Sequence, residues 1–152
     1  MTTRIVFLVG ASGVGKTAVA EHLQAHPPWT GRTHFFDSIG VPSPEEMTEG
    51  NGGGEGWQRW ATARWVDKLA SQPPLIQLLE AQTRPSFINE ALETHPALEA
   101  VIILLDCRRE VRRHRLANLR RRPELANPQN GRVGSLSPWP GGCLGFECGR
   151  HQ

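Results

Sequence analysis

One stretch of eight residues near the N-terminus constrains the fold of this chain more than any other feature. Residues 10–17 read Gly-Ala-Ser-Gly-Val-Gly-Lys-Thr and fit the pattern G-x-x-x-x-G-K-[ST] of a phosphate-binding P-loop. The five residues before it, 5–9, are all apolar, which predicts a strand that is buried on both faces. Apolar residues at 18, 19, 20 and 23 follow it with the spacing of a helix. A strand, a glycine loop and a helix in this order predict a phosphate-binding loop in an α/β fold.

Positions in the P-loop have expected roles in binding a nucleotide and its metal. Its glycines let backbone amides turn inward around a polyphosphate without intruding side chains. Lys16 is expected to place its ammonium group on the β- and γ-phosphates, and the Thr17 hydroxyl is expected to bind the Mg²⁺ that bridges them. The cofactors predicted are therefore ATP and Mg²⁺. The residues expected to bind the nucleotide are Gly10, Ser12, Gly13, Val14, Gly15, Lys16, Thr17 and Ala18.

Apolar runs alternate with helical patterns along residues 1–127, which form one predicted domain. Strands are expected at 5–9, 33–37, 75–79 and 101–105. Strands that alternate with helices over short connections form a parallel sheet that is covered on both faces. The predicted fold class is therefore α/β, with three layers and a parallel sheet of four or five strands. Residues 128–152 contain six glycines and three prolines without a periodic apolar face, which predicts an irregular tail in which a fifth strand is not recognisable.

The segment between the second and third predicted strands contains two helical patterns. A capping box at residues 43–46, Ser-Pro-Glu-Glu, predicts a helix that stops by Gly50. The glycine-rich residues 50–56 are interpreted as a flexible hinge or loop. Beyond them, one broad apolar face of a helix is predicted, most simply as part of the core. Its members are Trp57, Trp60, Ala61, Trp65 and Leu69.

Two acids follow predicted strands, at the edge where parallel α/β sheets bind ligands. Asp37 ends the second strand, where it is able to orient or deprotonate an acceptor hydroxyl, hold a metal-bound water, or merely cap a turn. Glu80 follows the third strand, where burial of an unpaired carboxylate is costly, so we expect it to face a metal ion or Arg84. Arg84 is interpreted either as a clamp for an anion or as the partner of Glu80.

The distribution of charge and the cysteine content bear on nucleic-acid binding and on the location of the protein. The net charge is only +2, yet eight of the fifteen arginines lie between residues 108 and 122, in a predicted helix. This helix is interpreted as a solvated face, a phosphate-binding lid or a nucleic-acid surface; the lack of aromatic residues in it disfavours nucleic acid. Three cysteines without a C-x-x-C pair, and no recognisable signal peptide or membrane span, favour a cytoplasmic protein. The sequence does not indicate an oligomeric state.

Residues 4 to about 127 resemble small P-loop kinases of the nucleoside-monophosphate, shikimate and gluconate kinase group. The resemblance implies transfer of the ATP γ-phosphoryl group to a small-molecule acceptor. It implies that Asp37 contacts the acceptor or the metal, and that Glu80, Gln82 and Arg84 contact the acceptor. It also implies that lid arginines embrace the transferred group, for which Arg115 and Arg120 are the candidates. The alternative hypotheses are a nucleotide-dependent switch and a nucleic-acid-binding ATPase that uses the arginine-rich helix.

Overall fold

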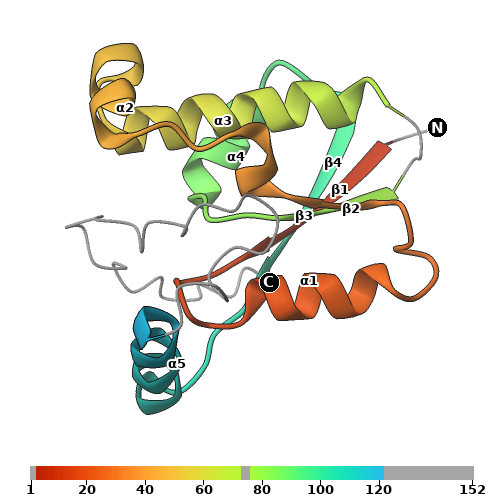
Figure 1. Ribbon diagram of the computed structural model, residues 1–152. Coiled ribbons are helices and arrows are strands. Elements are labelled where there is room, and N and C mark those ends of the chain that lie inside the picture. The colour runs from red at the N-terminus through yellow and green to blue at the C-terminus, as the bar shows by residue number, and fades with distance from the viewer. Residues whose placement is uncertain (1–2, 73–75, 122–152) are drawn as a thin grey trace, which may run out of the picture.

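A four-stranded parallel sheet forms the centre of the protein (Figure 1). The computed structural model describes residues 3–72 and 76–121. The strands are β1 (Thr3–Val9), β2 (Thr33–Phe35), β3 (Ile76–Glu80) and β4 (Leu98–Leu104), in the order β2-β3-β1-β4. All three pairings are parallel, so the strands end at one edge: Leu8 pairs with Glu80, and Glu80 with Phe35. This confirms the predicted α/β class. The predicted tail at 128–152 and the boundary at 127 lie outside the described residues.

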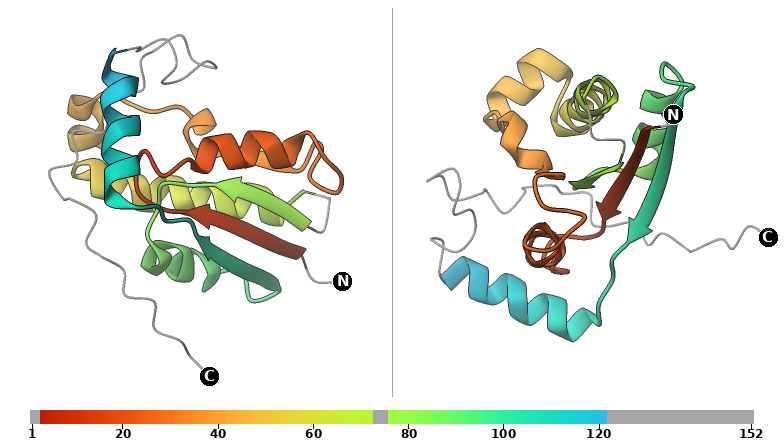
Figure 2. Two further views of the ribbon diagram at one scale, coloured as in Figure 1. Left: turned by 90° about the horizontal axis from the view of Figure 1, so that it is seen from below. Right: turned by 90° about the vertical axis from the view of Figure 1, so that its right-hand side faces the viewer.

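Helices cover the two faces of the sheet, as the side view in Figure 2 shows. The helices are α1 (Lys16–Gln24), α2 (Pro44–Asn51), α3 (Gly54–Ala70), α4 (Pro85–Leu92) and α5 (Arg109–Arg121), with a short 3-10 helix η1 (Phe36–Ile39) after β2. Alternate residues of β1 enter two separate cores. Ile5 and Phe7 pack with Trp65 of α3, whereas Val6 packs with Ala20 of α1. A strand that is apolar on both faces is therefore required at this position. None of the helices in the described ranges is long and apolar enough to cross a membrane.

The connection between α2 and α3 differs from the predicted hinge. The capping box is present, because the Ser43 hydroxyl accepts a hydrogen bond from the Glu46 amide at 3.3 Å and the Glu46 carboxylate accepts one from the Ser43 amide at 2.7 Å. However, α2 continues through Gly50 to Asn51, and α3 begins at Gly54. The interpretation of residues 50–56 as a flexible loop was therefore wrong. Only Gly52 and Gly53 separate the helices, and both adopt positive φ angles.

Three other expectations need correction. Trp60 is 46% exposed, whereas the other residues of the predicted apolar face of α3 are buried. The second strand ends at Phe35, so Asp37 lies in η1 rather than on the strand. The fourth strand is less covered than predicted: among the described residues β4 pairs only with β1, and Val101–Leu104 are 37–48% exposed.

Candidate functional site

The P-loop lies between the end of β1 and the start of α1. Gly15 precedes the first residue of α1 and has a φ angle of 105°, a conformation that side chains other than glycine rarely adopt. A Cβ atom on Gly10 would lie 2.3 Å from the carbonyl oxygen of Leu105, so glycine is required there for a close approach to the end of β4. The amides of the first turn of α1 have no carbonyl partner within their own helix. These amides can therefore bind an anion, which the helix dipole also favours.

Lys16 places a buried positive charge inside the loop. Only 6% of this residue is exposed, and its ammonium group donates hydrogen bonds to the carbonyl oxygens of Gly10 at 2.9 Å and Ala11 at 3.3 Å. Its positive charge also acts on Asp37 and Glu80, where it works against a rise in pKa that burial causes. The charge of Lys16 therefore acts on both acids, which lie on different elements, η1 and β3.

The two acids lie in an environment that disfavours their charged forms. Burial raises the pKa of Glu80, Lys16 offsets part of that rise, and the charge of Asp37 raises the pKa further. Burial also raises the pKa of Asp37, again partly offset by Lys16. The hydroxyl of Thr17 donates to the Glu80 carboxylate at 3.4 Å. A hydroxyl oxygen and two carboxylates are the kind of donors that Mg²⁺ prefers, so these residues fit the predicted metal.

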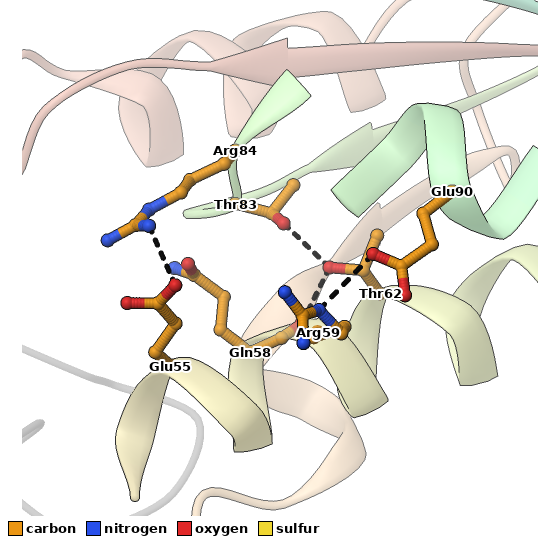
Figure 3. A network of polar contacts seen from close by, with 7 residues as sticks. All are labelled: Glu55, Gln58, Arg59, Thr62, Thr83, Arg84 and Glu90. Atoms are coloured by element: carbon orange, nitrogen blue, oxygen red, sulfur yellow. Dashed lines mark hydrogen bonds and ion pairs between the residues drawn. The ribbon is translucent and has the colours of Figure 1, made fainter. Parts of the chain in front are cut away.

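Gln82 joins the P-loop to the segment that follows β3. Its side-chain oxygen accepts a hydrogen bond from the Ser12 hydroxyl at 3.2 Å. Its backbone oxygen accepts a hydrogen bond from the side-chain amide of Gln58 in α3. Next to it, the hydroxyl groups of Thr62 and Thr83 lie 2.6 Å apart (Figure 3). The segment at 82–84 is therefore held between the phosphate loop and α3.

Arg84 pairs with a residue that the sequence did not indicate. Its Nη1 atom lies 2.9 Å from the carboxylate of Glu55, in the first turn of α3 (Figure 3). Of the two interpretations of Arg84, the pairing with Glu80 is not observed, because Arg84 contacts Glu55 and the carboxylate of Glu80 interacts with Thr17. Glu55 was missed because residues 50–56 were interpreted as a loop, and Gln58 was missed because it does not belong to the apolar face from which the helix was predicted. Their spacing of three places them on one side of a helix, but only the packing of α3 beside residues 82–84 gives that side a role.

The arginine-rich helix α5 contacts the P-loop. Arg115 donates a hydrogen bond to the carbonyl oxygen of Val14 at 2.7 Å. A Cβ atom on Gly13 would lie 2.8 Å from Cγ of Leu116, so this leucine packs directly on the loop. Arg115, one of the two candidate lid arginines, therefore contacts the P-loop itself. The side chain of Arg120 lies outside the part of the chain that the structure describes.

Comparison with known proteins supports the fold. No protein-family model and no curated protein matches the sequence. A gluconokinase from Sinorhizobium meliloti 1021 matches with a TM-score of 0.56 at 20% identity, over 77% of this chain and 65% of that chain. A sugar kinase from Janibacter sp. HTCC2649 matches with a TM-score of 0.50 at 21% identity, over 76% of this chain and 66% of that chain.

A third match is the shikimate kinase from Acinetobacter baumannii, solved in complex with shikimate. Its TM-score is 0.51 at 21% identity, over 83% of this chain and 69% of that chain. The chain thus covers just under two thirds of the gluconokinase and of the sugar kinase. At 20–21% sequence identity, this structural similarity establishes the fold of the chain. The chain has the α/β fold of the P-loop kinases.

Proposed function

We propose that this chain binds ATP with Mg²⁺ and transfers the γ-phosphoryl group to a small-molecule acceptor. The observation that carries the proposal is the contact of Thr17 with Glu80 at the carboxyl edge of the parallel sheet, beside a buried Lys16 whose charge acts on Glu80 and Asp37. Phosphoryl transfer depends mainly on positioning and on positive charge around the transferred group. A buried ammonium group within a phosphate-binding loop, opposite two carboxylates, supplies both requirements.

The nucleotide side of the site consists of the P-loop and α5. We assign the phosphates to the amides of residues 13–18 and to the ammonium group of Lys16, with Gly10 and Ser12 shaping the loop. Thr17 would hold Mg²⁺ directly, Glu80 would hold it directly or through water, and Asp37 would contact it only through water, so that its carboxylate stays available to the acceptor. The ion would neutralise charge that develops on the phosphate oxygens. Arg115 already lies against the loop at Val14 and would add a second positive charge there.

The acceptor side consists of η1 and the segment after β3. Asp37 would accept the proton of the acceptor hydroxyl as its oxygen forms a bond to the γ-phosphorus and the bond to the β-phosphate oxygen breaks. Burial raises the pKa of Asp37, which makes its carboxylate a better base than an exposed aspartate. Glu80, Gln82 and Arg84 would orient the acceptor. Gln82 is suited to this role because it also contacts Ser12 of the P-loop.

A transfer assay tests the proposal directly. The protein would be incubated with γ-labelled ATP, Mg²⁺ and a panel of sugar acids, sugars, nucleotides and amino alcohols, and labelled products would be separated. We expect label to transfer to at least one acceptor. Tight binding of ATP without transfer to any compound would reject the kinase while retaining the nucleotide site.

A conservative substitution tests the metal ligand separately. Thr17→Val removes the hydroxyl group but preserves the shape of the side chain. We expect it to weaken ATP binding in the presence of Mg²⁺ by about tenfold or more, by analogy with other losses around metal sites, and to change binding in EDTA much less. Thr94→Val makes the same chemical change just beyond α4, where the hydroxyl donates a hydrogen bond to the carbonyl oxygen of Ala91. Equal effects of the two variants would contradict the assignment.

A further inference from the structure

An exposed ion pair lies on the acceptor side of the candidate site. The carboxylate of Glu55 contacts Nη1 of Arg84 at 2.9 Å, and the two side chains are 55% and 45% exposed. The guanidinium group of Arg84 also stacks on the ring of Phe87, 5.5 Å from its centroid. Among the described residues, Glu55 is the only hydrogen-bond partner of this guanidinium group, which has five N–H donors. Most of its binding capacity is therefore available to a ligand.

A second ion pair on the same ring provides a comparison. Arg59 stacks on Phe87, 4.8 Å from the ring centroid. Figure 3 shows its contact with Glu90, at 3.2 Å. That pair joins two helices, α3 and α4, and makes no hydrogen bond to the P-loop within the described residues. Arg84 differs because it ends the segment whose Gln82 contacts the P-loop. Of the two pairs, only the one with Glu55 is tied to the phosphate-binding loop through the same short segment.

We propose that Glu55 determines acceptor specificity by occupying the position that a carboxylate of the acceptor takes. This inference rests on the proposed kinase function. The contact between Glu55 and Arg84 shows that a carboxylate fits at this guanidinium group. An exposed ion pair with a single hydrogen bond is weak, whereas a ligand carboxylate is able to use two parallel N–H donors. An acceptor with a carboxylate replaces Glu55, whereas a neutral acceptor leaves the pair intact.

For a ligand carboxylate to replace Glu55 at Arg84, we expect that only the side chain of Glu55 must rotate. Gly56, the next residue, packs against the backbone of Asn51, where a Cβ atom would lie 1.8 Å from the carbonyl oxygen. The backbone of α3 at Glu55 is thereby fixed against α2. Glu55 therefore competes with a ligand carboxylate for Arg84, and its removal should raise the affinity for carboxylates without changing the fold.

Binding measurements without nucleotide test the inference. The probes are gluconate, a polyol with one carboxylate, and sorbitol, its neutral counterpart. Binding would be followed by titration calorimetry and by the NMR signal of the Arg84 Nε–H group. We expect Glu55→Gln to bind gluconate about two- to fivefold more tightly than the unmodified chain, since that range corresponds to loss of one exposed ion pair. Sorbitol binding should not change.

Two further variants control for charge and for the arginine. Glu90→Gln breaks the comparison pair and should leave gluconate binding unchanged. Glu55→Gln combined with Arg84→Gln should lose the gain. The inference is overturned if Glu55→Gln binds gluconate no more tightly than the unmodified chain, or if Glu90→Gln gives an equal gain. Because no nucleotide is used, these outcomes are independent of the transfer assay, which alone decides whether the chain is a kinase.

Discussion

Replacing Gly56 with alanine distinguishes the observed packing of α2 on α3 from a flexible glycine loop. Gly56 lies in the first turn of α3, and a Cβ atom there would lie 1.8 Å from the carbonyl oxygen of Asn51 and 2.9 Å from its carbonyl carbon. Both are backbone atoms, so a side-chain rotation does not relieve the overlap. The end of α2 must move by about 1.6 Å before the contact reaches the ordinary distance of 3.4 Å.

The expected change in stability combines two opposite effects. Alanine is favoured over glycine inside a helix by about 1 kcal/mol. Forcing an extra methyl group into a packed contact costs about 1–3 kcal/mol. Gly56→Ala should therefore change the free energy of unfolding by between about zero and −2 kcal/mol. In a flexible loop the same substitution would stabilise the protein by about 0.4–1 kcal/mol, because it restricts the unfolded chain.

Gly50→Ala is the matched control for this measurement. Gly50 lies in α2, and a Cβ atom on it would meet nothing within 4 Å. This variant should gain about 1 kcal/mol from helix propensity alone. Urea unfolding followed by circular dichroism should rank Gly56→Ala below Gly50→Ala by about 1–3 kcal/mol. Equal stability of the two variants would refute the close packing of α2 on α3.

Three other predictions concern the site and the sheet edge. Lys16→Ala should reduce turnover in the transfer assay at least about a hundredfold, by analogy with other losses of preorganised charge stabilisation, and an unchanged rate would mean that the loop is misassigned. Burial raises the pKa of Glu80 above its ordinary value of 4.5, so the folded protein favours the protonated carboxyl group. The contribution of Glu80 to the free energy of unfolding is therefore fully present below the unfolded-state pKa and is lost as pH rises through the folded-state pKa. Glu80→Gln should therefore raise the urea midpoint at pH 7.5 but not below pH 4, and a gain that is constant with pH would contradict this. Ile103 is 45% exposed on β4, so Ile103→Lys should change the free energy of unfolding, measured with urea, by less than about 0.5 kcal/mol; a loss of several kcal/mol would contradict this exposure.

Local patterns in the sequence predicted most of the sheet and the centre of the site. The P-loop, the apolar strand before it and the helix after it are specified within residues 5–23, so their prediction required no tertiary information. Acids after successive strands were predicted to meet, because parallel strands end at one edge of a sheet. The structure places Asp37 two residues beyond the end of β2, in η1, yet still within electrostatic reach of Lys16.

The missed features depend on contacts between distant segments. Glycine is typical both of flexible loops and of close backbone approach, and the sequence alone does not distinguish these. The structure shows close backbone approach, because Gly56 packs against Asn51, and Glu55 lies in the helix α3. The partner of Arg84 was missed for the same reason, since Glu55 is distant in sequence. Trp60 was assigned to the core from periodicity alone, although a helix of this length also has an exposed side.

Removal of Mg²⁺ should show whether the two acids are arranged for a metal. Burial raises the pKa of both Asp37 and Glu80, so at neutral pH their negative charges are held in an unfavourable environment that Lys16 offsets only in part. A divalent cation at Thr17 and Glu80 would remove much of this penalty, whereas ATP alone would bring further negative charge toward it. At a concentration one hundred times its dissociation constant, a ligand stabilises the folded state by about 2.7 kcal/mol.

Thermal unfolding with ATP and Mg²⁺ should therefore give a clear rise in melting temperature, and ATP with EDTA a much smaller one at the same concentration. In Glu80→Gln the two conditions should converge, because the carboxylate that makes the cation favourable is gone. An equal rise with ATP in EDTA would mean that the acids do not face a metal, and their raised pKa values would then reflect burial without function.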